Sequence, residues 1–382
     1  LSLKSQEEWK ATSLSKRVLY LRMLSVTLDK NKIKYAKMMA LEMGKPIEQG
    51  LDEIEKCIWL CNFYFENALS FLKHKKVNFD NNRSIVTFQP LGLILGIMPW
   101  NFPFWQVFRF SIPVLLSGNT AILKHSLFVP SCASLIEKIF SKLDTPKNIY
   151  QNIRLSNEDT NDLIKNPFVS AVSFTGSTKG GMSVAQTAGS ALKKVLLELG
   201  GNDPYLVFSD ARLDNAVQSC IEGRLLNAGQ SCISAKRIIV VDEIYEQFIE
   251  KIIRKLEQKT MGDPTVGVDI GPLVSAEARD NVENQVQISI KAGAKLLMGG
   301  FITTPNSAFY PITVLSEVRP GMIAFDEEIF GPVFSLVRAK SEEEAIKLAN
   351  LSKYGLGAAI FTQNIEKAEE IANQKLNVGM CY

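Results

Sequence analysis

One cysteine of the chain, Cys232, has neighbours that suit a reactive thiol. It closes the segment "AGQSC", in which a glycine and small polar residues precede the cysteine. Such residues occur where backbone must approach a ligand closely, and a catalytic thiol needs partial exposure and backbone donors nearby. A free cysteine is also among the most buried residue types. The local sequence therefore supports two interpretations, a structural core thiol and a nucleophile.

A general base for such chemistry would have to be a carboxylate, because the chain has only two histidines, His74 and His125. A Cys-His pair would need one of them to reach Cys232. Glu198 ends an apolar run in "LLELGGNDP", just before two glycines that break the run. We expect apolar surroundings to raise its pKa toward neutrality, as a base that activates water requires. The alternative for Glu198 is a capping or solvated side chain.

Two further segments could bind anionic groups. "FTGSTKGG" follows an apolar strand and precedes a helix of small residues, so backbone N–H groups near Gly176 and Ser177 can approach a phosphate. Its spacing from Gly176 to Gly181 is neither the dinucleotide fingerprint nor a P-loop. "PWNFPFW" supplies Asn101, whose amide could donate to an oxyanion, although a turn is the commoner role of asparagine.

The composition is that of an ordinary globular enzyme. The 382 residues are 46% hydrophobic and 22% charged, with a net charge of +3, which predicts two domains plus a small appendage and no nucleic-acid partner. The longest apolar stretches, 91–100 and 111–123, are too short or too interrupted to span a bilayer, so we expect no membrane association. Six cysteines without regular spacing favour a reducing compartment and a cytoplasmic location.

Only one pair of residues has the spacing of metal ligands. Cys57 and Cys61 lie one helical turn apart, but no second pair accompanies them. We therefore expect both cysteines to pack in a core, and we expect no metal.

The positions of apolar residues predict the elements that carry these segments. Two helices fill most of 14–72, and "NFDNNRSIVTFQPLG" predicts a hairpin that turns at "DNNR". From residue 91, short apolar runs alternate with helical stretches, which favours βαβ units and a mostly parallel sheet. The alternation restarts after residue 211, which indicates a second domain. We assign 1–71 and 91–200 to one domain, 72–90 to the hairpin and 201–382 to the other.

The order of the motifs resembles the aldehyde dehydrogenase superfamily over almost the whole chain, and succinate-semialdehyde dehydrogenases most of all. The motifs are "EMGKP", "PWNFP", "FTGS", "LELGG", "GQSC", "GDP" with "GPL", and "EEIFGPV". The resemblance implies an α/β fold with a Rossmann-type parallel-sheet cofactor domain, an α/β catalytic domain and a β-hairpin oligomerisation arm.

The resemblance also implies catalytic roles. Cys232 matches the nucleophile, whose thiolate attacks an aldehyde to give a thiohemiacetal and, after hydride transfer, a thioester. Asn101 and the backbone N–H of Cys232 match the donors to the oxyanion. Glu198 matches the base that activates water to release the acid. No metal is needed for this chemistry.

For the cofactor, the resemblance implies NADP or NAD. Lys124 matches the lysine at the adenosine ribose, and Glu328 and Phe330 match residues around the nicotinamide. Leu127 occupies the position where NAD-preferring relatives often carry an acidic residue, and its lack of charge permits a 2′-phosphate, so we expect NADP ahead of NAD. The full set of expected cofactor-binding residues is Trp100, Lys124, Ser126, Gly176, Ser177, Gly181, Leu199, Glu328 and Phe330.

Arg109 matches an arginine that binds the distal carboxylate of succinate semialdehyde, a task that suits a guanidinium fork. The alternative is a helix-surface ion pair. Many such enzymes place a second arginine six residues before the cysteine. That position is Leu226 here, and Arg224 lies two residues further back.

The expected activity is NAD(P)-dependent oxidation of succinate semialdehyde to succinate. The alternatives are a dehydrogenase of another small aldehyde and a truncated, inactive member that retains the fold. A cofactor-independent thiol acyltransferase is disfavoured by the intact "FTGS" and "EEIFGP" segments. Compared with similar proteins, we expect about forty residues to be missing before Leu1 and about sixty after Tyr382. We expect a homodimer or homotetramer if the full arm is present.

Overall fold

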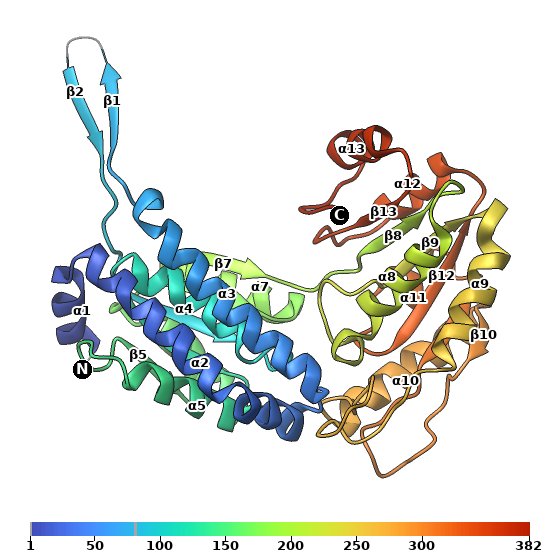
Figure 1. Cartoon of the computed structure of the whole chain (residues 1–382), viewed down its shortest axis with the longest axis horizontal. Helices are drawn as coiled ribbons and strands as arrows, with labels where there is room; N and C mark the ends of the chain where they lie inside the picture. Colours follow the sequence, from blue (N-terminus) through green and yellow to red (C-terminus); the bar gives the residue numbers. More distant parts are fainter. Residues whose placement is uncertain (1, 80–81) are drawn as a thin grey trace. The chain divides into compact units, whose positions relative to one another are not determined.

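The computed structural model describes residues 2–79 and 82–382, which form two compact units (Figure 1). The first unit holds the residues up to Glu42 together with Ile47–Leu199, and the second holds Met43–Pro46 together with Gly200–Tyr382. Both units contain parallel strands joined by helices, which confirms the predicted α/β class. The cofactor and catalytic roles assigned to the two halves of the chain stay predictions.

The first unit is built on a five-stranded sheet with the order β5-β4-β3-β6-β7, and all its strand pairs are parallel. The chain starts in the middle of this sheet and fills one side before the other. The strands are β3 (Leu93–Met98), β4 (Thr120–His125), β5 (Tyr150–Ile153), β6 (Val169–Thr175) and β7 (Lys194–Glu198). The strand order therefore reverses beside β3, and in open parallel sheets ligands bind at the carboxyl ends of the strands at such a point.

Helices cover this sheet. Helix α4 contacts β3 and β4, and α7 contacts β6 and β7. Gly96 of β3 permits the close approach of α4, because a Cβ atom there would lie 2.4 Å from the ring of Phe110. The helices are α1 (Ser2–Ala11), α2 (Leu14–Met43), α3 (Ile47–Phe71), α4 (Trp105–Leu116), α5 (Pro130–Ser141), α6 (Asn157–Lys165) and α7 (Thr178–Ser190). Cys57 and Cys61 are fully buried on α3, as packing residues of the core.

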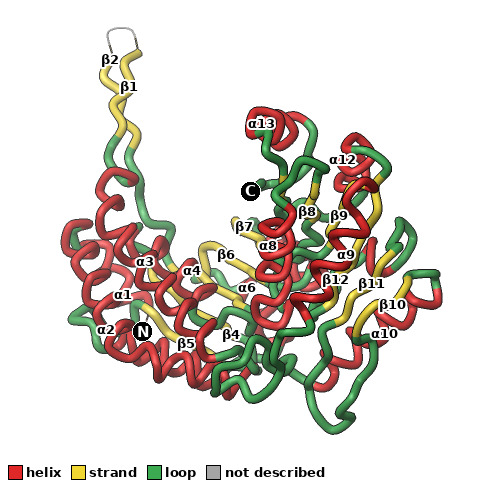
Figure 2. Tube along the Cα trace, turned by 45° about the vertical axis from the view of Figure 1, so that its right-hand side comes forward, coloured by secondary structure: helices red, strands yellow, loops and turns green. Residues whose placement is uncertain are grey.

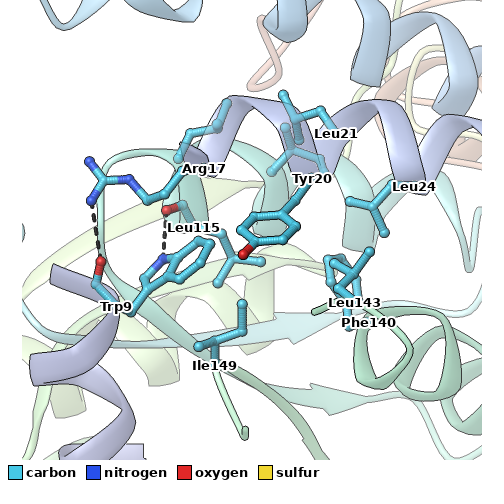
Figure 3. Close-up of a pocket in the computed structure, with 11 residues that line it drawn as sticks. Trp9, Arg17, Tyr20, Leu21, Leu24, Leu115, Phe140, Leu143 and Ile149 are labelled. Atoms are coloured by element: carbon cyan, nitrogen blue, oxygen red, sulfur yellow. Dashed lines mark hydrogen bonds between the residues drawn. The ribbon is translucent and has the colours of Figure 1, made fainter. Parts of the chain in front are cut away.

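A small apolar cavity lies among α1, α2, α4 and α5 (Figure 3). It leaves about 20 Å³ for the centre of a water molecule, which is room for one. At its rim the indole Nε1 of Trp9 donates to the carbonyl of Leu115 at 2.9 Å, and the guanidinium of Arg17 donates to the carbonyl of Trp9. The first bond joins α1 to the end of α4 and the second joins α2 to α1, and we regard the cavity as a packing gap of the core.

The predicted hairpin is present as β1 (Lys75–Phe79) and β2 (Asn82–Val86), which pair antiparallel with Lys75 opposite Val86. They form a separate two-stranded sheet that extends away from the helices of the first unit (Figure 1). The apolar side chains of Val77, Ile85 and Val86 are each about half exposed. Asp80 and Asn81 of the predicted turn "DNNR" lie outside the described residues.

The second unit is built on a six-stranded sheet with the order β10-β11-β12-β9-β8-β13. Among the described strands of this sheet, only β10 runs antiparallel to its neighbour. The strands are β8 (Pro204–Val207), β9 (Arg237–Val241), β10 (Lys295–Met298), β11 (Thr313–Ser316), β12 (Val333–Ala339) and β13 (Ala359–Phe361). All five residues of the central strand β9 are buried, as expected for a strand covered on both faces.

Helices α9 and α12 contact β9 and β12 of this sheet (Figure 2). The helices of the second unit are α8 (Leu213–Leu225), the 3-10 turn η1 (Leu226–Gly229), α9 (Asp242–Leu256), α10 (Ala276–Lys291), α11 (Ile323–Asp326), α12 (Glu342–Asn350) and α13 (Ile365–Gln374). Across the described part of the chain, we find no helix with both the length and the apolar character that crossing a membrane requires.

Candidate functional site

The first unit gathers seven of the predicted site residues at one edge of its sheet. Because β3, β4, β6 and β7 are parallel, their carboxyl ends meet at the same edge. The segments that follow these strands carry Trp100 and Asn101 after β3, Lys124 and Ser126 at the end of β4, Gly176 and Ser177 after β6, and Glu198 at the end of β7. Residues spread over about a hundred positions of the sequence are thereby brought to one place.

The turn that carries Asn101 is fixed by a buried carboxylate. Glu53 of α3 accepts hydrogen bonds through Oε1 from the backbone N–H groups of Phe104 at 2.8 Å and Trp105 at 2.9 Å. These donors belong to the first turn of α4, which has no side-chain cap of its own. A carboxylate there also complements the positive end of the helix dipole. Asn101 itself is 5% exposed.

His125 fastens the same turn from β4. Its Nδ1 accepts from the N–H of Ser126 at 2.9 Å, so its Nε2 carries the proton and donates to the carbonyl of Pro103 at 3.0 Å. Burial lowers the pKa of His125 to about 4, so the ring is neutral at physiological pH. Both ring nitrogens thus bind backbone of the first unit. His125 is a structural anchor, a role that sequence reasoning missed for it and for Glu53.

The predicted phosphate turn lies at the start of α7. Ser177 caps this helix, and its Oγ accepts from the N–H of Gly180 at 3.2 Å. A Cβ atom at Gly176 or Gly180 would lie 2.7 or 2.8 Å from the ring of Phe174. At Gly181 a Cβ atom would lie 2.4 Å from the side chain of Leu199, so these two predicted cofactor residues pack together. Gly176, Gly180 and Gly181 therefore place no Cβ atoms around the start of α7, and a helix N-terminus of this kind suits a phosphate.

Lys124 lies at the end of β4, and Leu127 lies in the segment that follows the strand. Lys124 is half-buried, and burial lowers its pKa. Leu127 is exposed, and it places no carboxylate at the position where one would repel a 2′-phosphate.

The sequence led us to expect apolar surroundings for Glu198, but the structure places a cation beside it. Its carboxylate is partly exposed, and its Oε2 lies 3.7 Å from Nη1 of Arg109 on α4. The second terminal nitrogen of Arg109, Nη2, donates to Oγ1 of Thr175 at 3.4 Å. The expected substrate-binding arginine and the expected base therefore face each other at the same edge of the sheet.

In the second unit, Cys232 follows a strained turn. Asn227, Ala228 and Gly229 all have left-handed backbone conformations, with φ angles of 55°, 54° and 75°. Such conformations are unfavourable for the two residues that carry a Cβ atom, and strain of this kind clusters at functional sites. Gly229 is required, because a Cβ atom there would lie 2.1 Å from the carbonyl oxygen of Gly331. Cys232 is partly exposed, as a reactive thiol must be.

Two buried cations connect the segment of Cys232 with the segment of Glu328 and Phe330. Arg224 is fully buried, and its guanidinium donates to the carbonyls of Ile329 at 2.8 Å, Gly331 at 2.6 Å and Val333 at 2.5 Å. The Nζ of Lys236 lies 3.0 Å from Oε1 of Glu328. The guanidinium of Arg224 is thus bound by backbone carbonyls inside the core. Leu226, at the position of the second expected arginine, is about one third exposed.

Asp203 is a buried carboxyl beside these groups. Its Oδ1 accepts from the N–H of Gly357 at 3.1 Å, and burial raises its pKa to about 7 against the opposing effects of Lys236, Gly357 and Arg237. An unfolded aspartate titrates near 3.9. The folded state therefore binds this proton more tightly, and the contribution of Asp203 to stability falls as the pH rises from about 4 to about 7.

We accordingly expect Asp203→Asn to remove this pH dependence. The free energy of unfolding of the variant minus that of the wild type should rise across the same pH window, by up to about 4 kcal/mol. Urea unfolding at several pH values measures it. Asp214→Asn is the control, because the exposed Asp214 pairs with Lys251 and has a lowered pKa, so its contribution changes only under more acidic conditions. A constant difference for Asp203→Asn would contradict the raised pKa.

A protein-family model matches almost the whole chain. Residues 2–382 match the model described as "Aldehyde dehydrogenase family". The NAD(P)+ succinate semialdehyde dehydrogenase Sad of Escherichia coli K12 is 39% identical over 366 residues, which cover 96% of this chain and 79% of that protein. The NADP+ succinate-semialdehyde dehydrogenase of Deinococcus radiodurans is 38% identical over 376 residues, covering 98% and 79%.

Solved structures of similar proteins align with the whole of this chain. The succinic semialdehyde dehydrogenase from Streptococcus pyogenes, in complex with NADP+ as the cofactor, aligns with a TM-score of 0.97 and 33% identity over 100% of this chain and 84% of its own. Lactaldehyde dehydrogenase from Escherichia coli aligns with a TM-score of 0.95 and 33% identity, over 100% and 80%.

Proposed function

Because the chain belongs to the aldehyde dehydrogenase family, we propose that it oxidises succinate semialdehyde to succinate with NADP or NAD, using Cys232 as the nucleophile. The observation that carries the proposal is the edge of the first sheet, where the strand ends present Asn101, Ser177 and Glu198 in the order of the family's motifs. The named activities of the similar proteins support the choice of aldehyde.

In this mechanism the thiolate of Cys232 attacks the aldehyde carbon and forms a thiohemiacetal. The side-chain amide of Asn101 and the backbone N–H of Cys232 stabilise the oxyanion that develops on the former carbonyl oxygen. Glu328 and Phe330 would hold a nicotinamide cofactor, which would supply the hydride acceptor needed to convert this adduct into a thioester on Cys232. Glu198 then takes a proton from water as that water attacks the thioester, which releases the acid and the thiol.

The residues present fit such a cofactor. The start of α7, with its capping Ser177 and its glycines, can receive a diphosphate, and the carboxylate of Glu328 can accept from ribose hydroxyls. Trp100, Lys124, Ser126, Leu199 and Phe330 complete the proposed binding set. The uncharged Leu127 permits the 2′-phosphate, and similar proteins use NADP+, so NADP ranks ahead of NAD.

Steady-state kinetics of the purified protein test the activity directly. Succinate semialdehyde should reduce NADP, and NAD more slowly. Mass spectrometry after mixing should show the succinyl thioester on Cys232. The absence of both cofactor reduction and an adduct on Cys232 would reject the enzymatic proposal. It would favour an inactive relative that retains the fold.

Arg109 is the proposed ligand of the distal carboxylate. We expect Arg109→Gln to lower kcat/KM for succinate semialdehyde about 10- to 100-fold, because a charge-assisted hydrogen bond to the carboxylate is lost. For a straight-chain aldehyde without a carboxylate the change should be less than about threefold. Arg319→Gln, at an exposed surface ion pair of the second unit, is the matched control.

An equal loss for both aldehydes would show that Arg109 acts on Glu198, 3.7 Å away, instead of on the substrate carboxylate. It would then favour the second candidate function, oxidation of a small aldehyde without a distal carboxylate. That candidate is supported by Leu226 at the place of a second arginine and by the likeness to a lactaldehyde dehydrogenase.

The hairpin β1–β2 is the proposed oligomerisation arm, and a homodimer or homotetramer is the proposed assembly. Its two strands pair only with each other among the described strands, and they expose Val77, Ile85 and Val86. Sedimentation of the purified protein tests this, and a monomer would contradict it. The proposed location is cytoplasmic, because six cysteines without regular spacing favour a reducing compartment.

A further inference from the structure

Lys236, four residues after Cys232, is a buried cation surrounded by acceptors. Its side chain is almost completely buried. The Nζ donates to the carbonyl of Ser231 at 2.8 Å and to the carbonyl of Cys232 at 2.6 Å, and it lies 3.0 Å from Oε1 of Glu328. Three oxygens around one nitrogen match the three N–H groups of an ammonium ion. Burial lowers the pKa of Lys236, and the nearby carboxylate of Glu328 opposes this shift.

The contact with Ser231 has a direct geometric consequence for the proposed oxyanion donor. The carbonyl of Ser231 and the N–H of Cys232 belong to the same peptide group, which is planar and trans. A bond that fixes the direction of this carbonyl therefore fixes the direction of the N–H on the other side of the peptide. A cationic partner on the carbonyl also polarises the peptide and strengthens its N–H as a donor.

The contact with Glu328 extends this control to the proposed cofactor site. The carboxylate of Glu328 also lies against Gly200 and Gly201, where the N–H of Gly201 is 3.4 Å from Oε1. A Cβ atom at Gly200 would lie 2.3 Å from Oε2, so the two glycines admit the carboxylate at this place. Lys236 thus holds Glu328 and the peptide of Cys232 at fixed positions relative to each other.

We propose that Lys236 is a positioning residue that aims the backbone N–H of Cys232 at the oxyanion and holds the carboxylate of Glu328 for the cofactor. The inference rests on the roles proposed above for Cys232 and Glu328. It differs from a packing role because it predicts a loss in the step that forms and collapses the thiohemiacetal, together with weaker cofactor binding, in a protein that remains folded.

The test compares Lys236→Met, which keeps the length and apolar volume of the side chain, with the wild type. The single-turnover rate of cofactor reduction should fall about 10- to 100-fold, because loss of one oxyanion donor costs about 10²- to 10³-fold and a misdirected donor costs less. The Kd of NADP, measured by calorimetry without aldehyde, should rise. Lys251→Met is the matched control, since Lys251 lies on the surface of α9 and pairs with Asp214.

Lys236→Met leaves Glu328 without its cation, so a second comparison covers the case in which the variant does not fold. The double variant Lys236→Met/Glu328→Gln is compared with Glu328→Gln alone. The proposal expects the double variant to reduce the cofactor at least about tenfold more slowly in a single turnover, because only the double variant frees the peptide of Cys232. Equal rates in this comparison would overturn the proposal.

The two proposals fail differently. A wild-type protein without turnover rejects the proposed function. An active wild type together with a folded Lys236→Met variant whose single-turnover rate and NADP Kd stay within about twofold of it rejects only the role of Lys236.

Discussion

Cys232→Ala is expected to abolish aldehyde oxidation, with kcat at least about 10⁴-fold below the wild type. The proposed route needs a covalent bond between the aldehyde carbon and sulfur, and no other thiol lies on the strained turn beside Arg224, Lys236 and Glu328 among the described residues. Because the cofactor does not bind through the sulfur, the Kd of NADP should change less than about threefold. Kinetics measure the first effect and calorimetry the second.

Cys381→Ala serves as the control for the loss of a thiol, because Cys381 is also partly exposed but lies near the end of the chain. It should leave kcat and the mass of the acyl adduct unchanged. Turnover by Cys232→Ala within about tenfold of the wild type would contradict covalent catalysis at this residue and would restore the interpretation as a structural thiol.

Glu198→Gln is expected to slow release of the acid and to leave formation of the thioester largely intact. Steady-state kcat should fall about 10²- to 10⁴-fold, because water then attacks without a base. Rapid mixing should still show a burst of about one reduced cofactor per active site, and the succinyl thioester should accumulate on Cys232. Glutamine keeps an oxygen that can accept from Arg109, so the neighbouring guanidinium retains a partner.

Glu250→Gln is the matched control, since Glu250 forms an exposed ion pair with Arg254 on α9. A Glu198→Gln variant that shows no burst would place Glu198 before the thioester, as the base that activates the thiol. A variant with wild-type turnover would return Glu198 to the alternative that the sequence left open, a solvated carboxylate.

The parallel sheets show how much the alternation of apolar runs and helices can predict. The strands β3, β4, β6 and β7 lie where short apolar runs were expected, and the order of the motifs then predicts that Asn101, Gly176 and Glu198 follow strand ends. Neighbouring strand ends of a parallel sheet must share an edge, so local pattern was sufficient to group these residues. The family followed from the same motifs, and the comparisons confirm it.

Individual contacts could not be predicted in this way. Arg224 lies two residues before the position of the second expected arginine, and its partners Ile329, Gly331 and Val333 hold it in the core. They lie more than a hundred residues along the chain. Glu198 was expected in apolar surroundings, but α4 brings Arg109 beside it. No sequence signal pointed to Glu53 or His125 as anchors of the Asn101 turn, because each acts on backbone groups that any residue type would offer.

The sequence by itself determined the fold class, the family and the residue types available for thiol chemistry, because these depend on periodicity and on short motifs. The tertiary structure decided which charges serve the site and which serve the core. Lys236 binds the carbonyls of Ser231 and Cys232 and also the carboxylate of Glu328, a residue far along the chain. The segments of Lys236 and Glu328 precede β9 and β12, and the pairing of these two strands belongs to the tertiary structure. The sequence left the role of the cysteine in "AGQSC" open, and the structure adds Lys236, whose Nζ binds the two carbonyls beside that cysteine.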